Sequence, residues 1–233
     1  MRWFVVLVAV VLVGCGAQAP ALPEGLALRS QQLVGMPSPD PAAVPEFSLY
    51  GDGTVIRPGP EKGAVLTAET VQIGQERAEE LYQEAHDVGL AKNQEIPNTS
   101  VVDGYLQVFV LNSGGQRFAT LAATPGDSSD LGEFRSTLRV DGPAKPYRPT
   151  KIAAVGWAPD SSQDGRPWPF PALDQQTQEG TCVILDAAQV SALAEDVPLG
   201  TRWRIGETTY VVVFRPLLPD ESTCGDLDVP RAG

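Results

Sequence analysis

The pattern of this chain is clearest in Phe47-Ser48-Leu49-Tyr50-Gly51-Asp52-Gly53-Thr54-Val55-Ile56, where apolar and β-branched residues flank a Gly-Asp-Gly turn. Such flanks favour strands, and Gly and Asp tolerate the backbone angles of a tight turn. The stretch therefore predicts a β-hairpin over residues 47–56. Asp52 at its tip is a candidate acidic catalyst, but the turn needs an Asp there for backbone reasons, and we favour that structural role.

Two later stretches repeat the same arrangement of strands around turn residues. The predicted hairpins are Val101–Leu111 with Gln116–Ala122 around Ser113-Gly114-Gly115, and Thr201–Ile205 with Tyr210–Phe214 around Gly206-Glu207. Strands outside these hairpins are predicted at Leu26–Leu33, Lys151–Trp157 and Cys182–Leu185.

Helical spacing is present in three places. Apolar residues recur at helical intervals over Gln75–Val88, and Gly89 follows as a C-terminal cap. Asp127-Ser128-Ser129-Asp130 is a helix start with apolar residues behind it, and Ala187–Ala194 is a short third helix. Strand runs come in adjacent pairs without regular β-helix-β alternation, so we predict an α+β fold of antiparallel β-hairpins with two or three short helices.

The N-terminus decides where the protein is expected to reside. Met1-Arg2 precedes an apolar run, Trp3–Val13, which as a helix is about 17 Å long and too short to cross a bilayer. The run ends in Leu12-Val13-Gly14-Cys15, which resembles the bacterial lipobox, although an ordinary secretory signal with a chance cysteine is the alternative. We therefore expect a removed signal peptide over 1–14 and a lipid on Cys15.

The organisation that follows is a lipidated tether and a globular part. Small residues and prolines from Gly16 to Pro23 favour a flexible tether over 15–25. No polar linker interrupts the chain from Phe47 to Cys224, so residues 26–233 are expected to form one domain, with a split near 141–149 as the alternative. The expected location is the extracytoplasmic side of the cell membrane, held by the lipid.

Charge restricts the partners. The chain has a formal net charge of −12 at pH 7, and its acidic residues are scattered. Nucleic acids and anionic membrane surfaces bind clustered Lys and Arg, so the composition argues against both. A cell-envelope protein or polymer is the expected partner, and a specific cationic ligand is the alternative to a merely solvated acidic surface.

The cysteine count predicts a disulfide. If Cys15 carries the lipid, Cys182 and Cys224 are left as an even pair in an oxidising compartment. Reactive or metal-binding thiols are the alternative, without CxxC spacing to support them. His86 is the only histidine and lacks ligands at metal spacing, so we expect neither a metal site nor a cofactor, and no Ser/His/Asp triad.

One proline-rich segment carries aromatic side chains. Arg166-Pro167-Trp168-Pro169-Phe170-Pro171 has the composition of a polyproline-like segment. Trp168 and Phe170 are candidate contacts to a ligand or partner, although such a segment more often packs its aromatic residues onto the core.

Two stretches are specific enough to suggest a family. Phe47–Gly53, and Phe214-Arg215-Pro216-Leu217-Leu218-Pro219-Asp220-Glu221 with Cys224, resemble a family of uncharacterised exported lipoproteins from actinobacteria. The order of features matches across nearly the whole mature chain. The resemblance implies export, the lipid anchor and the disulfide, and it assigns no catalytic residue.

The usual catalytic motifs are absent from the sequence, including Gly-x-Ser-x-Gly, Gly-x-x-x-x-Gly-Lys and His-Glu-x-x-His. We therefore expect a non-catalytic binding or interaction module on the outer face of the cytoplasmic membrane. One alternative is a hydrolase of cell-envelope glycans that uses a carboxylate pair such as Asp52 with Asp103. The other is an inhibitor of exported proteases that presents a rigid proline-rich loop.

Overall fold

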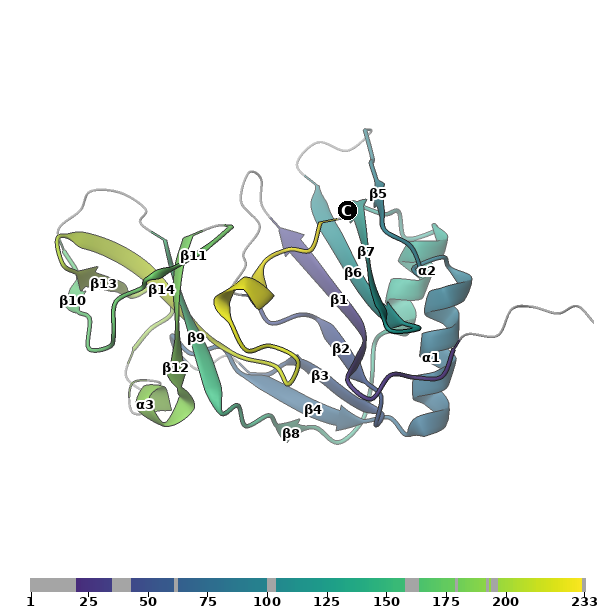
Figure 1. Ribbon diagram of the computed structural model, residues 1–233, viewed down its shortest axis with the longest axis horizontal. Coiled ribbons are helices and arrows are strands. Elements are labelled where there is room, and N and C mark those ends of the chain that lie inside the picture. Colours follow the sequence, from purple (N-terminus) through teal and green to yellow (C-terminus); the bar gives the residue numbers. More distant parts are fainter. Residues whose placement is uncertain are drawn as a thin grey trace, which may run out of the picture.

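The computed structural model describes residues 20–34, 43–60, 63–99, 104–157, 164–178, 180–191, 193 and 197–231. The predicted signal peptide and Cys15 lie outside the described residues, as does Asp103. Two β-sheets lie side by side, and helices α1 (Gln75–Asp87) and α2 (Asp130–Thr137) cover one face of the larger sheet (Figure 1).

The larger sheet has the strand order β5-β7-β6-β1-β2-β3-β4-β8. Strand β1 lies between β2 and β6, so the sheet joins hairpins that are far apart in the sequence. All neighbours are antiparallel except β5 and β7, which are parallel. The strands are β1 (Leu26–Val34), β2 (Phe47–Tyr50), β3 (Thr54–Pro58), β4 (Ala68–Gln72), β5 (Gln94–Ile96), β6 (Tyr105–Ser113), β7 (Gln116–Ala123) and β8 (Lys145–Pro146).

The smaller sheet has the order β10-β13-β14-β9-β12-β11, with β10 and β13 parallel. The chain enters it after β8, within the connection 141–149 that the sequence offered as an alternative boundary. Its strands are β9 (Lys151–Trp157), β10 (Arg166–Pro167), β11 (Gln175–Thr177), β12 (Gly180–Asp186), β13 (Arg202–Ile205) and β14 (Thr208–Pro216); helix α3 (Ala187–Ser191) follows β12, and a 3-10 helix, η1 (Cys224–Leu227), follows β14.

These elements agree with the predicted α+β class, with three α-helices in the described ranges and a clear excess of strand. The three predicted hairpins are present, and their turns contain glycines with positive φ at Gly53, Gly114, Gly115 and Gly206. The prediction of antiparallel hairpins covers only part of the sheets, because each sheet also has a parallel pair at an edge. The edge strands β5 and β10 have only three and two residues, and each pairs in parallel with one strand of a hairpin, β7 and β13.

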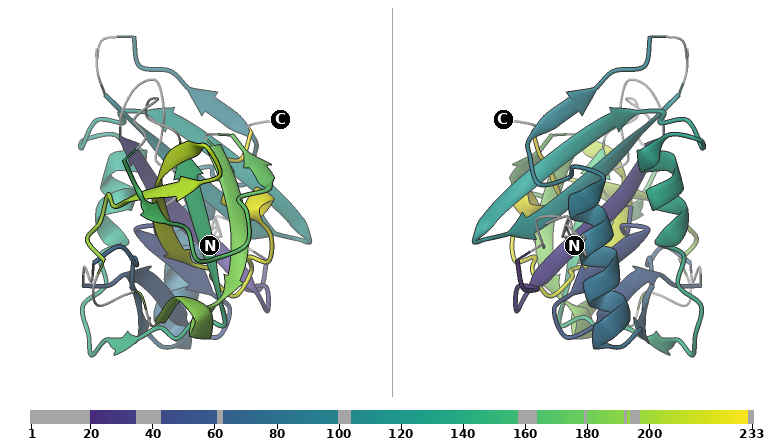
Figure 2. Two further views of the ribbon diagram at one scale, coloured as in Figure 1. Left: turned by 90° about the vertical axis from the view of Figure 1, so that its left-hand side faces the viewer. Right: turned by 90° about the vertical axis from the view of Figure 1, so that its right-hand side faces the viewer.

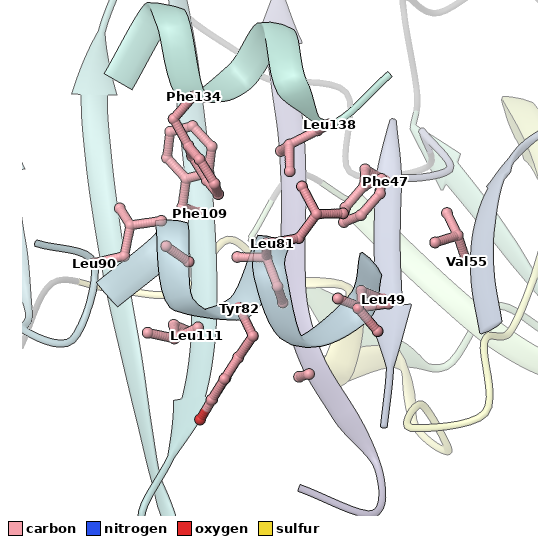
Figure 3. Packing of buried hydrophobic residues seen from close by; sticks show 14 of the residues in the cluster. Phe47, Leu49, Val55, Leu81, Tyr82, Leu90, Phe109, Leu111, Phe134 and Leu138 are labelled. Atoms are coloured by element: carbon pink, nitrogen blue, oxygen red, sulfur yellow. The ribbon is translucent and has the colours of Figure 1, made fainter. Parts of the chain in front are cut away.

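The main core lies between the larger sheet and its two helices (Figure 3). Helix α1 buries Ala78, Leu81, Tyr82 and Ala85, the positions that its apolar spacing predicts. Leu81 is fully buried, and burial of such a side chain contributes roughly 1.5–3 kcal/mol. Both helices lie on the near face of this sheet in the right-hand view of Figure 2.

The last part of the chain joins the two sheets. After β14, Leu218 packs with Leu26, Tyr50 and Ile56 on the sheet face opposite the helices, and Val229 packs farther along the same sheet. Cys182 of β12 and Cys224 of η1 form the predicted disulfide, with a Cα–Cα distance of 6.0 Å. The C-terminal segment is therefore fastened to the smaller sheet and packed on the larger one.

Candidate ligand-binding groove

A groove of about 520 Å³ runs beside α2, where the helix passes the middle of β1, the start of β2 and the end of β3. This volume falls in the range of small-molecule sites in proteins. The strand side contributes Ser30, Glu46, Phe47 and Arg57. We call this feature the α2 groove.

The sequence of α2 explains why the helix has a polar face there. Ser129 caps the helix, as predicted, and its Oγ accepts a hydrogen bond from the Gly132 amide at 3.1 Å. Leu131, Phe134 and Leu138 pack into the core. The residues that line the groove on this side recur at intervals of three and four: Gly132, Arg135 and Ser136 in the helix, and Arg139 just after it.

Two of the three groove arginines are held by the protein itself. Arg57 pairs with Glu69 at 2.7 Å and donates to the Val140 carbonyl, which fixes the chain after α2. Arg135 donates to Gln32 Oε1 and lies 5.3 Å from the centroid of the Tyr105 ring. These contacts order the walls of the groove before any ligand arrives.

Other charged groups in the groove are left without partners. The side chains of Asp127, Arg139 and Asp141 are exposed and make no hydrogen bond or ion pair among the described residues. Asp127 lies before the start of α2, whereas Arg139 and Asp141 follow its end. The helix that separates them has eight residues and is about 12 Å long.

Buried polar groups lie beneath the groove. Ser30 is 1% exposed, and its Oγ accepts a hydrogen bond from Gln107 Nε2 at 2.8 Å. Gln107 Oε1 is buried and has no partner among the described residues. Buried polar atoms are normally satisfied, so the floor retains unused hydrogen-bonding capacity.

The candidate contacts Trp168 and Phe170 lie elsewhere, in the smaller sheet. The Trp168 ring stacks on Phe214 at 6.0 Å and meets Phe170 and Trp203 edge-on at 5.1 and 5.6 Å. Its Nε1 donates to the Pro171 carbonyl at 2.6 Å. Both side chains are half-buried in this aromatic cluster, and neither lines the α2 groove.

The residues considered for catalysis do not form a complete site. Asp52 Oδ1 accepts a hydrogen bond from the Thr54 amide at 2.9 Å, which is the structural role expected of the turn. His86 Nε2 lies 3.1 Å from Ser113 Oγ, a contact that the sequence did not suggest. Burial lowers the pKa of His86, but neither residue lines the groove and no carboxylate hydrogen-bonds to the ring in the described ranges. A triad needs that third group and an accessible substrate site.

A buried ion-pair network lies where the two sheets meet. Arg29 of β1 pairs with Asp220 at 2.7 Å and with Glu221 at 3.0 Å. Arg215 of β14 also holds Glu221, at 2.6 and 2.9 Å to its two oxygens. Tyr50 donates to Asp220 at 2.7 Å. The stretches Phe47–Gly53 and Phe214–Glu221, far apart in the sequence, therefore meet in this network.

The surroundings of Arg29 and Tyr50 shift the pKa values of both side chains. Burial lowers the pKa of Arg29, but the carboxylates of Glu221 and Asp220 outweigh that effect and the pKa is raised. Burial and Asp220 raise the pKa of Tyr50, so its hydroxyl stays protonated and donates. A fully paired buried cluster of this kind joins the sheets, and we assign it a structural role.

Comparisons with protein-family models, with curated proteins and with solved structures find no match for this chain. Within the described ranges, no helix combines the length and the apolar composition needed to cross a bilayer. In the same ranges no three His, Cys, Asp or Glu side chains gather closely enough to hold a metal ion.

Proposed function

We propose that this protein is a lipid-anchored binding module on the outer face of the cytoplasmic membrane, and that it holds its ligand in the α2 groove. The observation that carries the proposal is the groove itself, a ligand-sized depression with ordered walls and unpaired charges. Its partner would be an envelope polymer or an envelope protein.

The disulfide supports the proposed compartment. Cys182 and Cys224 are bonded, and such bonds persist in oxidising environments outside the cytoplasm. The third cysteine, Cys15, follows the apolar run at the lipobox position. Metabolic labelling with palmitate tests this part: the chain should be labelled and sediment with membranes, and Cys15→Ser should abolish both. An unlabelled wild-type chain would refute the anchor.

Filling the groove tests its role. Ser136 is exposed and lines the groove, so Ser136→Trp should occlude it without disturbing the core. Envelope components retained by the immobilised protein should be lost by this variant. Arg166→Gln, on β10 of the smaller sheet, is the control and should retain them. Equal retention by Ser136→Trp and wild type would remove the groove from the proposal.

A carboxylate-dependent hydrolase of envelope glycans is the second candidate, because Glu46, Asp127 and Asp141 all line the groove. Glycosidases use two carboxyl groups that flank the scissile bond. New reducing ends released from envelope glycan, and lost with Asp127→Asn or Asp141→Asn, would favour the enzyme. The protease-inhibitor hypothesis gains no such support, since Trp168 packs against three aromatic rings and is not presented as a free loop.

A further inference from the structure

The unpaired charges of the α2 groove have an order along the helix. Asp127 stands alone at the end where α2 begins, and no arginine that lines the groove lies beside it in sequence. Arg139 is at the other end, one turn beyond Arg135, and its guanidinium has no partner among the described residues. A ligand that pairs with Asp127 and Arg139 carries a cation toward Asp127 and an anion toward Arg139. Asp141, the third unpaired charge, lies two residues beyond Arg139.

The distance between these ends limits the ligand. The eight residues of α2 span about 12 Å, and an extended peptide covers roughly 3.3 Å per residue. Four residues therefore match the groove. Guanidinium groups bind carboxylates through two parallel hydrogen bonds, which suits a C-terminal carboxylate. An aspartate carboxylate suits a terminal ammonium group.

The floor fits a peptide backbone. The Ser30 hydroxyl accepts from Gln107 and keeps its own hydrogen free to donate. Ser30 lines the groove together with Phe47, Leu138 and Val140, which are apolar and mostly buried. These three residues supply apolar surface in a groove whose other lining residues are mostly polar or charged.

We propose that the α2 groove binds a short extended peptide of about four residues, with its free amino group at Asp127 and its free carboxylate at Arg139. This inference rests on the proposed binding function and gives it a ligand class. Arg57 and Arg135 act as positioning residues, since their own contacts already occupy them.

Calorimetry with the full-length chain in mild detergent tests the proposal. The probes are tetra-alanine, its N-acetyl form and its C-terminal amide. The wild type should bind the free peptide, and each blocking group should weaken binding roughly tenfold, as expected for loss of one charge-assisted hydrogen-bonded pair.

Charge-removing variants assign the two ends. Arg139→Gln should abolish the discrimination against the amide and keep that against the acetylated peptide, whereas Asp127→Asn should do the reverse. Arg166→Gln, on the distant smaller sheet, is the control and should keep both discriminations. Arg139 and Asp127 hold no other group, so these variants should fold as the wild type does.

Several results would overturn the proposal. One is equal affinity for the free and blocked peptides, and another is a discrimination that Arg139→Gln and Asp127→Asn leave intact. No binding of any of the three peptides at millimolar concentration would also overturn it. In that case the proposed function still stands if envelope components bind the wild type and are lost with Ser136→Trp, and it falls as well if they are not.

Discussion

Replacing Glu221 by Gln tests whether the buried ion-pair network holds the two sheets together. The Glu221 side chain is 1% exposed and accepts four hydrogen bonds, two from Arg215, one from Arg29 and one from the Leu218 amide. Gln has nearly the same shape as Glu but carries no charge. Its amide nitrogen is a hydrogen-bond donor and would face the N–H groups of Arg29, Arg215 and Leu218, which are donors too. Arg29 then keeps one carboxylate partner, Asp220, and Arg215 has none.

The expected loss follows from this geometry. Removing one partner of a buried pair leaves an uncompensated charge and costs about 3–5 kcal/mol. For a chain of this size that corresponds to a fall of about 6–20 °C in Tm. Asp186→Asn is the matched control, because its pair with Lys151 is similarly short, at 2.7 Å, but both of its side chains are exposed. Its loss should stay below about 1 kcal/mol.

Urea unfolding followed by tryptophan fluorescence measures the loss, since Trp203 is 2% exposed in the smaller sheet. The midpoint of Glu221→Gln should fall by roughly 1–2 M at an unchanged slope. Combining Arg215→Met with Glu221→Leu removes both charges and leaves the Arg29–Asp220 pair, so this double variant should recover much of the stability. A loss for Glu221→Gln no larger than that for Asp186→Asn would refute the reasoning.

Three further predictions concern separate features. Cys182→Ser opens a loop with a sequence separation of 42 and should cost about 4 kcal/mol, with faster proteolysis; equal urea midpoints for the variant and the oxidised wild type would contradict it. Burial lowers the pKa of His86 in the folded state, so the stability of the protein should fall as the pH drops below about 6.5 toward that pKa. Melting curves of His86→Gln should lack this part of the pH dependence. The same pH dependence in the variant and the wild type would contradict the prediction. A Cβ on Gly51 would lie 1.8 Å from the Pro23 carbonyl oxygen, so Gly51→Ala should cost roughly 1–3 kcal/mol and speed amide exchange near residue 25, whereas Gly25→Ala meets no atom within 4 Å and should change neither.

Local features of the fold were predictable because they depend on neighbours in the sequence. Positive φ at Gly53 and Gly206 falls in turns that the Gly and Asp content predicted. Helix α1 follows from the spacing of its apolar side chains. The pairing of β1 with both β2 and β6 was not predictable, because no local pattern in the sequence indicates which distant strands pair with each other. Strands as short as β8 and β10 carry no period at all.

The groove was hidden for a similar reason. The spacing of Gly132, Arg135, Ser136 and Arg139 is visible in the sequence. Only the fold shows that residues of β1, β2 and β3 lie across from them and complete a groove. Arg29 and Arg215 are both buried against carboxylates, and no local pattern in the sequence indicates this. The composition of the proline-rich segment made Trp168 a candidate contact to a ligand or partner. In the fold, Trp168 packs within an aromatic cluster instead.

The positions of the network residues along the chain set the order of folding. Arg29 is separated from Asp220 and Glu221 by 191 and 192 residues. While the chain grows from its N-terminus, β1, β2 and β6 can pair, but Arg29 has no carboxylate to neutralise it until residue 221 is available. The junction between the two sheets therefore forms last, through the final segment of the chain, and such long-range contacts should slow folding. A chain that stops before Asp220 would lack more than a tail, since it would leave two arginines buried without their counter-charges.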